Sequence, residues 1–409
     1  MPVKSQKLST EDHHSTTVPW LPAEPLLAPL LEQAHDLQQA AQRLAGVGVP
    51  LELRRLLQAM NAHDSLALEG LQVSPLDVER ALRSGDMLVS VDGLDDAGAR
   101  RVVAHMDTQA ALEARWGGWS CQKIWSAQMV RDIHQDLFAR LPAADLVLPT
   151  GQAMVPGALR KRAAGVAMHA APAPAEAGAL LARWGAVYGG VRRGELQLVA
   201  VAASHHRLAW IHPFPDGNGR VARLHTHLAL GALGLTQGLW SPLRGFARGD
   251  QAYRAQLAAA DAPFAHEADG SAQRSGQALA AWVAYVLALC QDEVALMSGL
   301  LDLSAMKDRI AACLAYEENV VRQGVRSASM RALHYLLLTS LAMERSDFKA
   351  LLGLGERLAT AQVTALLKSG LLATDSPHGK LRFGVPQHAL RFYFPGLWPA
   401  AEAGRGAAR

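Results

Sequence analysis

The side chains best suited to chemistry lie in one stretch of twelve residues, HPFPDGNGRVAR, which runs from His212 to Arg223. A histidine titrates near neutral pH, so His212 can take the proton from a hydroxyl group. Asp216 is the only carboxylate of the stretch, and an aspartate beside phosphates is a natural ligand for Mg²⁺. The residue types therefore predict a general base and a metal ligand within one short segment.

The second half of the stretch has the features of an anion site. Gly217 and Gly219 flank Asn218, and glycines let the backbone approach a ligand closely. A helix is expected to begin here, with its free N–H groups and positive dipole end directed at the loop. Arg220 and Arg223 share one face of its first turn, where the dipole disfavours cations, so a bound phosphate would explain them. The alternative is a loop that only joins two helices, with arginines for solubility.

This stretch resembles the signature of the Fic family, HxFx(D/E)GNGRxxR, at every specified position. The resemblance implies a nucleotidyltransferase that moves AMP from ATP onto a hydroxyl of a protein. It implies that His212 is the general base, that Phe214 packs inward to fix the loop, and that Asp216 coordinates Mg²⁺. It also implies that the phosphates of ATP are held by the remaining polar and glycine positions of the signature, which are Asp216, Gly217, Asn218, Gly219, Arg220 and Arg223.

The same resemblance bears on three further residues. The Doc branch, which phosphorylates its targets, has lysine at the second glycine, so Gly219 favours AMP transfer. Tyr253 resembles a tyrosine common after the catalytic helix and is expected to line the adenine pocket, with core packing as the alternative. His205 lies seven residues before His212, where Fic proteins often carry histidine. The alternative for His205 is a position on a helix face without a role.

Glu69 predicts a built-in inhibitor. It stands at the end of a helix expected from residue 50 to 68, where the dipole disfavours acids, and Gly70 suits the C′ position that follows. The segment SLALEG, starting at Ser65, resembles the inhibitory motif (S/T)xxxE(G/N) of self-inhibited Fic proteins. The resemblance implies that Glu69 pairs with Arg223 and blocks the place of the γ-phosphate, as in the N-terminally inhibited class. The alternative is an ordinary solvated helix-end acid.

Composition sets the wider limits. The formal charge is +3, with 40 basic and 37 acidic residues, which does not point to nucleic acid or membrane. The three cysteines show no metal-ligand spacing and suit a reducing cytoplasm, the expected location. The most apolar run, 278–290, is too short to span a bilayer and predicts a buried helix. The other common nucleotide motifs, the P-loop and G-x-G-x-x-G, are absent from the sequence.

The expected fold is mostly α, because alanine and leucine dominate and favour helices. We expect a Fic helical core with a small β-hairpin flap at 157–166, where Arg160 lies, and an irregular region at 84–118 with a strand at 87–91. A basic surface loop is the alternative for the flap. The expected divisions are a tail at 1–23, an N-terminal helical segment with the inhibitory helix at 24–119, the Fic core at 120–265, a helical extension at 266–320, a winged helix at 321–395 and a tail at 396–409.

The C-terminal region supports a rival function of another class. Three helices at 330–341, 346–354 and 357–368, followed by a two-stranded wing, predict a winged helix-turn-helix. The rival is therefore a DNA-binding regulator in which the Fic core senses nucleotide, with Lys380 and Arg382 of the wing touching phosphate. The third helix has few charges, which favours protein docking or a homodimer. The partners expected are a protein that bears the target hydroxyl, this chain included, DNA or a second copy at the winged helix, and no membrane.

Overall fold

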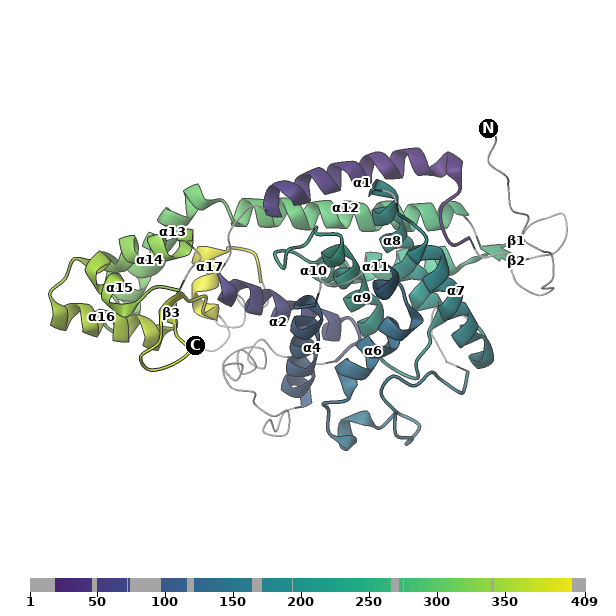
Figure 1. Cartoon of the computed structure of the whole chain (residues 1–409), viewed down its shortest axis with the longest axis horizontal. Helices are drawn as coiled ribbons and strands as arrows, with labels where there is room; N and C mark the ends of the chain where they lie inside the picture. The colour runs from purple at the N-terminus through teal and green to yellow at the C-terminus, as the bar shows by residue number, and fades with distance from the viewer. Residues whose placement is uncertain are drawn as a thin grey trace.

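The computed structural model describes most of the chain, and the described part is mostly α-helical, as predicted (Figure 1). The two-stranded sheets are small, and they pair Pro263–Ala265 (β1) with Ala272–Arg274 (β2) and Leu372–Ala373 (β3) with Arg382–Phe383 (β4), both antiparallel. The described residues are 19–45, 50–71, 73, 97–115, 121–163, 171–192, 194–265, 272–274, 276–339 and 342–398.

Two long helices run side by side along one edge of the molecule (Figure 1). They are α1, Glu24–Ala45, and α12, Gly276–Leu300. By length and composition alone α12 could cross a membrane, but half of its most apolar window is buried inside the protein. Its Trp282 indole donates to the carbonyl of Ala202 at 2.7 Å, which fixes α12 against α8. The run 278–290 is thus helical as predicted, with half of the apolar window buried, but it belongs to a helix of 25 residues, so the prediction that it is too short to span a bilayer was wrong.

The central layer is built around α8, Gly194–Ile211, which is buried along most of its length. The next helix, α9, Asn218–Ala232, packs against it and carries the second half of the motif. The other helices of this layer are α5, Cys121–Ile124, α6, Ala127–Phe138, α7, Ala177–Gly189, α10, Pro242–Arg248, and α11, Asp250–Asp261, with short 3₁₀ helices at Ala143–Leu146 and Pro174–Glu176.

Helix α2, Leu51–Ala67, ends as predicted, because Gly70 takes the left-handed backbone conformation with φ 73°. It packs against α4, Ala97–Glu113, in a region predicted to be irregular, so that prediction was wrong. The helix was missed because its buried face is partly polar: the Asn61 amide donates to Gln109 of α4 at 3.3 Å. The strand predicted at 87–91 lies outside the described residues.

The predicted flap at 157–166 differs from the expectation. Residues 157–163 contain a turn and no strand, and 164–166 lie outside the described residues. Arg160 is buried, and its guanidinium donates to the carbonyl oxygens of His212 at 2.7 Å and Ile211 at 3.4 Å. The alternative of a basic surface loop is therefore also wrong for Arg160, which ties this segment to the start of the motif.

The C-terminal elements follow the predicted order of three helices and an antiparallel hairpin. The helices are α14, Met330–Thr339, α15, Arg345–Leu352, and α16, Glu356–Ser369, and the hairpin is β3 and β4. The winged-helix classification itself stays a prediction. The remaining elements here are α13, Leu303–Tyr316, a π-helical turn at Glu317–Val321, 3₁₀ helices at Ser327–Ser329 and Gln387–Ala389, and α17, Leu390–Tyr393.

These C-terminal elements lie at one end of the molecule and meet the start of α2 there (Figure 1). Arg382 of β4 donates to Glu52 of α2 at 2.7 Å and also pairs with Asp375, so its guanidinium is engaged within the chain. Lys380 lies 3.2 Å from Glu344. A groove of about 870 Å³ runs between α2 and the C-terminal hairpin. The two wing cations that were predicted to touch DNA phosphates are thus both paired with acids.

Candidate active site

The chain leaves α8 at Ile211 and enters α9 through a tight loop. His212 has φ 49°, a left-handed conformation that is uncommon for a residue other than glycine. Gly217 has φ 77° and forms the N-cap of α9, where Val221 donates its backbone N–H to the Gly217 carbonyl at 3.0 Å. A β-carbon on Gly217 would lie 2.5 Å from the Phe138 ring, so the loop needs glycine for both conformation and space.

The inner side of the loop is held by His134 of α6. The buried Phe214 ring stacks on its imidazole with ring centroids 4.0 Å apart. Gly157 donates its N–H to Nδ1 at 2.8 Å, so the neutral ring carries its proton on Nε2 and donates it to the Asp216 carbonyl at 3.2 Å. Burial lowers the pKa of His134 to about 4, which keeps the ring neutral. Phe214 packs inward as predicted, and sequence reasoning missed His134 as its support.

Asn218 braces the same loop from the other side. Its Oδ1 accepts the Phe214 N–H at 2.8 Å, and its Nδ2 donates to the Phe214 carbonyl at 2.8 Å. The side chain was predicted to hold phosphates, whereas here it closes the loop on itself. A phosphate contact by Asn218 stays a prediction, and the first turn of α9 retains the N–H groups that a helix leaves without intrahelical partners.

A cleft of about 780 Å³ opens over this loop, a size within the usual range of small-molecule sites. It is bounded by the end of α2, the start of α9 and helix α11. Every residue that the sequence assigned to the site lines this one cleft, namely Glu69, His212, Asp216, Gly217, Asn218, Gly219, Arg220, Arg223 and Tyr253.

Glu69 sits between the two motif arginines. Its Oε1 lies 2.9 Å from Nη2 of Arg223, and its Oε2 lies 2.6 Å from Nε of Arg220. Arg223 is buried and also donates to the hydroxyl of Ser65 at 3.0 Å and to its carbonyl at 2.7 Å. The predicted contact between Glu69 and Arg223 is therefore present, and the contact with Arg220 is an addition that the sequence did not reveal.

The neighbourhood of Asp216 suits a magnesium ion that is shared with phosphates. Its side chain is 52% exposed, and Oδ2 accepts from Nη2 of Arg220 at 2.9 Å. The described residues hold no cluster of three or more histidine, cysteine or acidic side chains that could bind a metal on their own. Mg²⁺ commonly takes one or two carboxylates and completes its shell with phosphate oxygens and water. One accessible carboxylate beside an anion site fits that pattern.

Tyr253 and His205 lie behind the arginines. Tyr253 is 5% exposed and packs against the Phe246 ring at 4.7 Å, so it both lines the cleft and joins the core. Its role toward adenine stays a prediction. His205 is fully buried and lies 2.9 Å from the Tyr253 hydroxyl. Whether it has a role in the site or is a helix-face histidine without one stays untested.

Comparison with known proteins places this geometry in context. A sequence model of the Fic/DOC family matches residues 124–230, which include the motif from His212 to Arg223 but neither Glu69 nor Tyr253. No curated protein sequence matches the chain.

Solved structures of similar shape include three proteins of low sequence identity. A Fic family protein from Desulfovibrio desulfuricans G20 is 19% identical, with 88% of this chain and 96% of that chain covered and a TM-score of 0.48. A Fic domain containing signaling protein from Bacteroides thetaiotaomicron is 17% identical, with 65% and 96% covered and a TM-score of 0.47. Fic-1 from C. elegans is 17% identical, with 68% and 75% covered and a TM-score of 0.43.

Proposed function

We propose that this protein is an adenylyltransferase that moves AMP from ATP onto a hydroxyl of a protein, a proposal supported by the match of residues 124–230 to the Fic/DOC family model. The target is the side chain of a serine, threonine or tyrosine, on another protein or on this chain itself. The observation that carries the proposal is that the base, the carboxylate and both arginines of the motif line a single cleft of nucleotide size.

In the proposed reaction His212 takes the proton from the target hydroxyl, and that oxygen attacks the α-phosphorus of ATP. The bond from the α-phosphorus to the bridging oxygen breaks, and pyrophosphate leaves with the electron pair. Arg160 supports the base by binding the His212 carbonyl, and Phe214 and His134 fix the loop that follows. Asp216 is the residue that would hold Mg²⁺, which when bound would offset the negative charge of the phosphates.

Gly219 keeps the phosphate site open, and the difference from the lysine of the Doc branch at this position favours transfer of AMP. A β-carbon at this position would lie 2.8 Å from Nη1 of Arg223 and 2.8 Å from Oε1 of Glu69. Any larger residue would therefore displace the arginine cluster. Glycine instead leaves the start of α9 open, so that its N–H groups and dipole can receive the phosphates of ATP.

We also propose that Glu69 inhibits the enzyme. Its two carboxylate oxygens lie within 2.9 Å of Arg220 and Arg223, the cations assigned to the phosphates of ATP. A carboxylate and a phosphate cannot both occupy this position, so ATP must displace Glu69 before its phosphates can engage both arginines. Arg254, which donates to the Leu68 carbonyl, helps to hold the end of α2 in the inhibiting position.

The direct test is to incubate the purified chain with Mg²⁺ and ATP labelled on the α- or the γ-phosphate, in the presence of cell lysate. Transfer of the α-label alone is expected. The variant His212→Ala should lose transfer by roughly a hundredfold or more and retain ATP binding, because the anion site is untouched.

The matched control is His35→Ala, which removes an exposed surface histidine and should leave transfer unchanged. Transfer of the γ-label would instead indicate phosphorylation. Near-normal transfer by His212→Ala would remove the assignment of the base.

A further inference from the structure

The groove between the start of α2 and the C-terminal hairpin is a second site of ligand size. It holds about 870 Å³, which is within the usual range of ligand sites. No described residue lines both this groove and the cleft around His212. The groove therefore presents a set of side chains that is separate from the residues assigned to ATP.

The charged side chains of the groove are mostly basic. Four cations line it, and Glu52 is the one acid among its described lining residues; the cations are Arg55 of α2, Arg345 of α15, Lys368 of α16 and Arg382 of β4. The whole chain has 40 basic and 37 acidic residues, so the excess in the groove is a local feature. A groove lined by one sign of charge concentrates ligands of the opposite sign.

Two of these cations are available to a ligand without any rearrangement. Lys368 is exposed, and Arg345 uses its Nε on the Gly379 carbonyl at 3.1 Å. Neither cation forms an ion pair with another residue in the described part of the chain. A guanidinium has five N–H donors, so Arg345 keeps donors for an anion in the groove.

Arg382 is held by acids that another anion can replace. Its Nε lies 2.7 Å from Oε1 of Glu52, and its Nη1 pairs with Asp375, whose side chain is 72% exposed. Oε2 of Glu52 is buried and has no hydrogen-bond partner among the described residues. A buried carboxylate oxygen without a donor is unfavourable, so Glu52 gains by turning out to water when a ligand carboxylate takes its place.

The apolar part of the lining is aliphatic. It consists of leucine, valine and proline side chains, namely Leu56, Leu367, Leu372, Pro377, Val385 and Pro386. No phenylalanine, tyrosine or tryptophan is among the described lining residues. Proteins that bind single-stranded nucleic acid stack bases on aromatic rings, and a helix that reads duplex DNA normally has a denser basic face. Cations beside aliphatic side chains instead fit a polypeptide with acidic and apolar residues.

We propose that this groove binds an acidic segment of a partner protein. Carboxylates of the segment pair with Lys368, Arg345 and Arg382, and its apolar side chains pack against the aliphatic lining. One of the carboxylates replaces Glu52 on Arg382. Because the groove shares no described residue with the nucleotide cleft, this inference goes beyond the proposed function and does not depend on it.

The test begins with a library of random peptides displayed on phage and selected on the purified chain without nucleotide. The selection should enrich peptides that combine several aspartates or glutamates with leucine, isoleucine or valine. Fluorescence anisotropy of an enriched peptide, made synthetically, then measures its affinity. The affinity should fall by about tenfold when the salt concentration rises from about 0.05 M to about 0.5 M, because salt screens the ion pairs.

Three variants assign the peptide to the groove. Lys368→Glu should weaken binding by about tenfold or more, because it reverses an exposed charge of the groove. The matched control is Lys307→Glu, which reverses an exposed lysine outside the groove and should bind as the parent does. Glu52→Gln should bind several-fold more tightly, because the peptide no longer competes with a carboxylate for Arg382. Thermal unfolding shows whether each variant is folded.

The contrary outcomes are equally definite. No enrichment, enrichment of basic peptides, or parental affinity in Lys368→Glu would overturn the proposal. Unchanged affinity in Glu52→Gln would contradict the replacement of Glu52 on Arg382. A single-stranded or duplex DNA oligonucleotide that displaces the peptide at lower concentration than unlabelled peptide does would assign the groove to nucleic acid instead. None of these measurements uses ATP, so their outcome is independent of whether the protein transfers AMP.

Discussion

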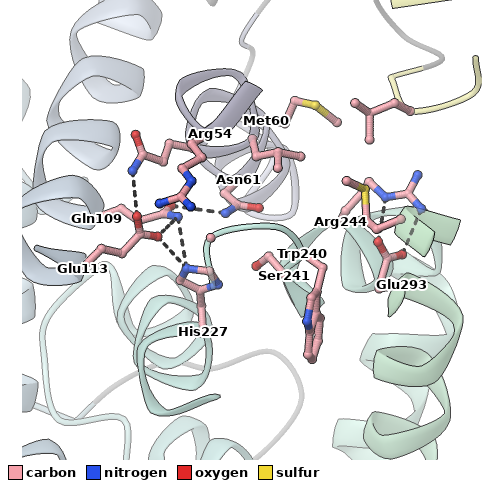
Figure 2. A pocket seen from close by; sticks show the side chains of 15 residues that line it. Arg54, Met60, Asn61, Gln109, Glu113, His227, Trp240, Ser241, Arg244 and Glu293 are labelled. Atoms are coloured by element: carbon pink, nitrogen blue, oxygen red, sulfur yellow. Dashed lines mark hydrogen bonds and ion pairs between the residues drawn. The ribbon is translucent and has the colours of Figure 1, made fainter. Parts of the chain in front are cut away.

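Two arginine–carboxylate sites in this protein use the same chemistry in opposite surroundings. Arg244 of α10 binds Glu293 of α12 through two contacts, at 2.7 Å and 3.2 Å, and both side chains are buried. The adjoining cavity holds about 20 Å³, room for about one water molecule. Figure 2 shows this pair on one side of the cavity and the bonded group of Gln109, Glu113 and His227 on the other.

The second site is the contact of Glu69 with Arg220 and Arg223. Glu69 keeps 20% of its side chain exposed, and the cleft beside it is about 780 Å³. The cleft beside Arg220 and Arg223 has room for a competing anion, whereas the cavity beside Arg244 has room for about one water molecule. The space beside an ion pair, rather than the geometry of the pair itself, therefore indicates whether another anion can replace the carboxylate.

We call the Arg244–Glu293 pair the closed pair and the contact of Glu69 with Arg220 and Arg223 the open pair. The largest expected effect concerns the closed pair. Glu293→Ala should reduce the free energy of unfolding by about 3–5 kcal/mol, because it leaves Arg244 charged and buried without a partner. Urea denaturation measures the loss. Glu293→Gln keeps a hydrogen-bonding group and should lose less, and neither variant should bind ATP more tightly. A loss under about 1 kcal/mol in Glu293→Ala would mean that the closed pair is as replaceable as the open one.

His105, whose pKa is lowered by burial and by the charges of Arg223 and Arg220, makes the free energy of unfolding depend on pH. Burial, and then the charges of Arg223 and Arg220, lower the pKa of His105 from 6.5 to about 3. Between these values the unfolded chain binds a proton that the folded chain does not, so the stability due to neutral His105 is full above pH 6.5 and falls as the pH drops. His105→Leu should make the loss of stability from pH 6 to pH 4 shallower, by about 1.4 kcal/mol per pH unit. An unchanged slope in pH-dependent unfolding would contradict this.

The open pair should respond in function more than in stability. Glu69→Gly should tighten ATP binding by about tenfold and raise self-modification, because Arg220 and Arg223 become free for phosphates. Its cost in unfolding free energy without nucleotide should be about 1 kcal/mol, since Glu69 is partly solvated. Calorimetry with ATP and urea denaturation measure the two effects.

The control for this variant is the double substitution Glu69→Gly with Arg223→Ala, which should lose the gain. If Glu69→Gly leaves transfer unchanged while His212→Ala still abolishes it, the contact seen here is an ordinary helix-end pair. The proposed catalysis would stand in that case, and the proposed inhibition would not.

The sequence predicted which residues lie together where those residues are local in the chain. The motif from His212 to Arg223 is contiguous, so its spacing alone brings these residues to one loop and one helix start, although other segments hold the loop in place. The contact of Glu69 with Arg223 was predicted from the resemblance to the inhibitory motif, and the unfavourable place of each residue on its own helix dipole agreed with it; the two lie together in the structure. Inhibition and the choice of ATP remain predictions that need the experiments above.

Sequence reasoning missed the contacts that depend on distant segments. Arg160 was predicted to lie in a β-hairpin flap, with a basic surface loop as the alternative. Its acceptors are instead backbone carbonyls, which any residue supplies and no motif marks. His134 supports the loop through a stacked ring and two backbone groups, again without a sequence signal. Helix α4 was missed because buried polar side chains interrupt its apolar spacing, and their partners lie on α2 and α9.

Helix α2 is held at both of its ends by ion pairs. Its first turn is fixed by Glu52 to Arg382, and its far end is fixed by Glu69 to Arg223, about 25 Å away along the helix axis. Helix α2 is therefore a rigid element that is held by an ion pair at each end. Because a helix does not shorten, withdrawal of Glu69 is absorbed either locally, by its side chain and the last turn at Gly70, or by opening of the ion pair between Arg382 and Glu52.

In the second route, opening of the ion pair at one end of α2 would favour opening of the ion pair at the other end. Consider a partner that binds the C-terminal elements only when the ion pair between Arg382 and Glu52 is open. By linkage, this partner would tighten nucleotide binding by the same factor as the nucleotide tightens binding of the partner. The ATP affinity of the Glu52→Gln variant distinguishes the two routes. Tighter binding assigns the movement to the whole of α2, and unchanged binding assigns it to the end of α2 near Glu69. If the whole helix moves, binding at the C-terminal groove would be coupled to nucleotide binding in the cleft through α2.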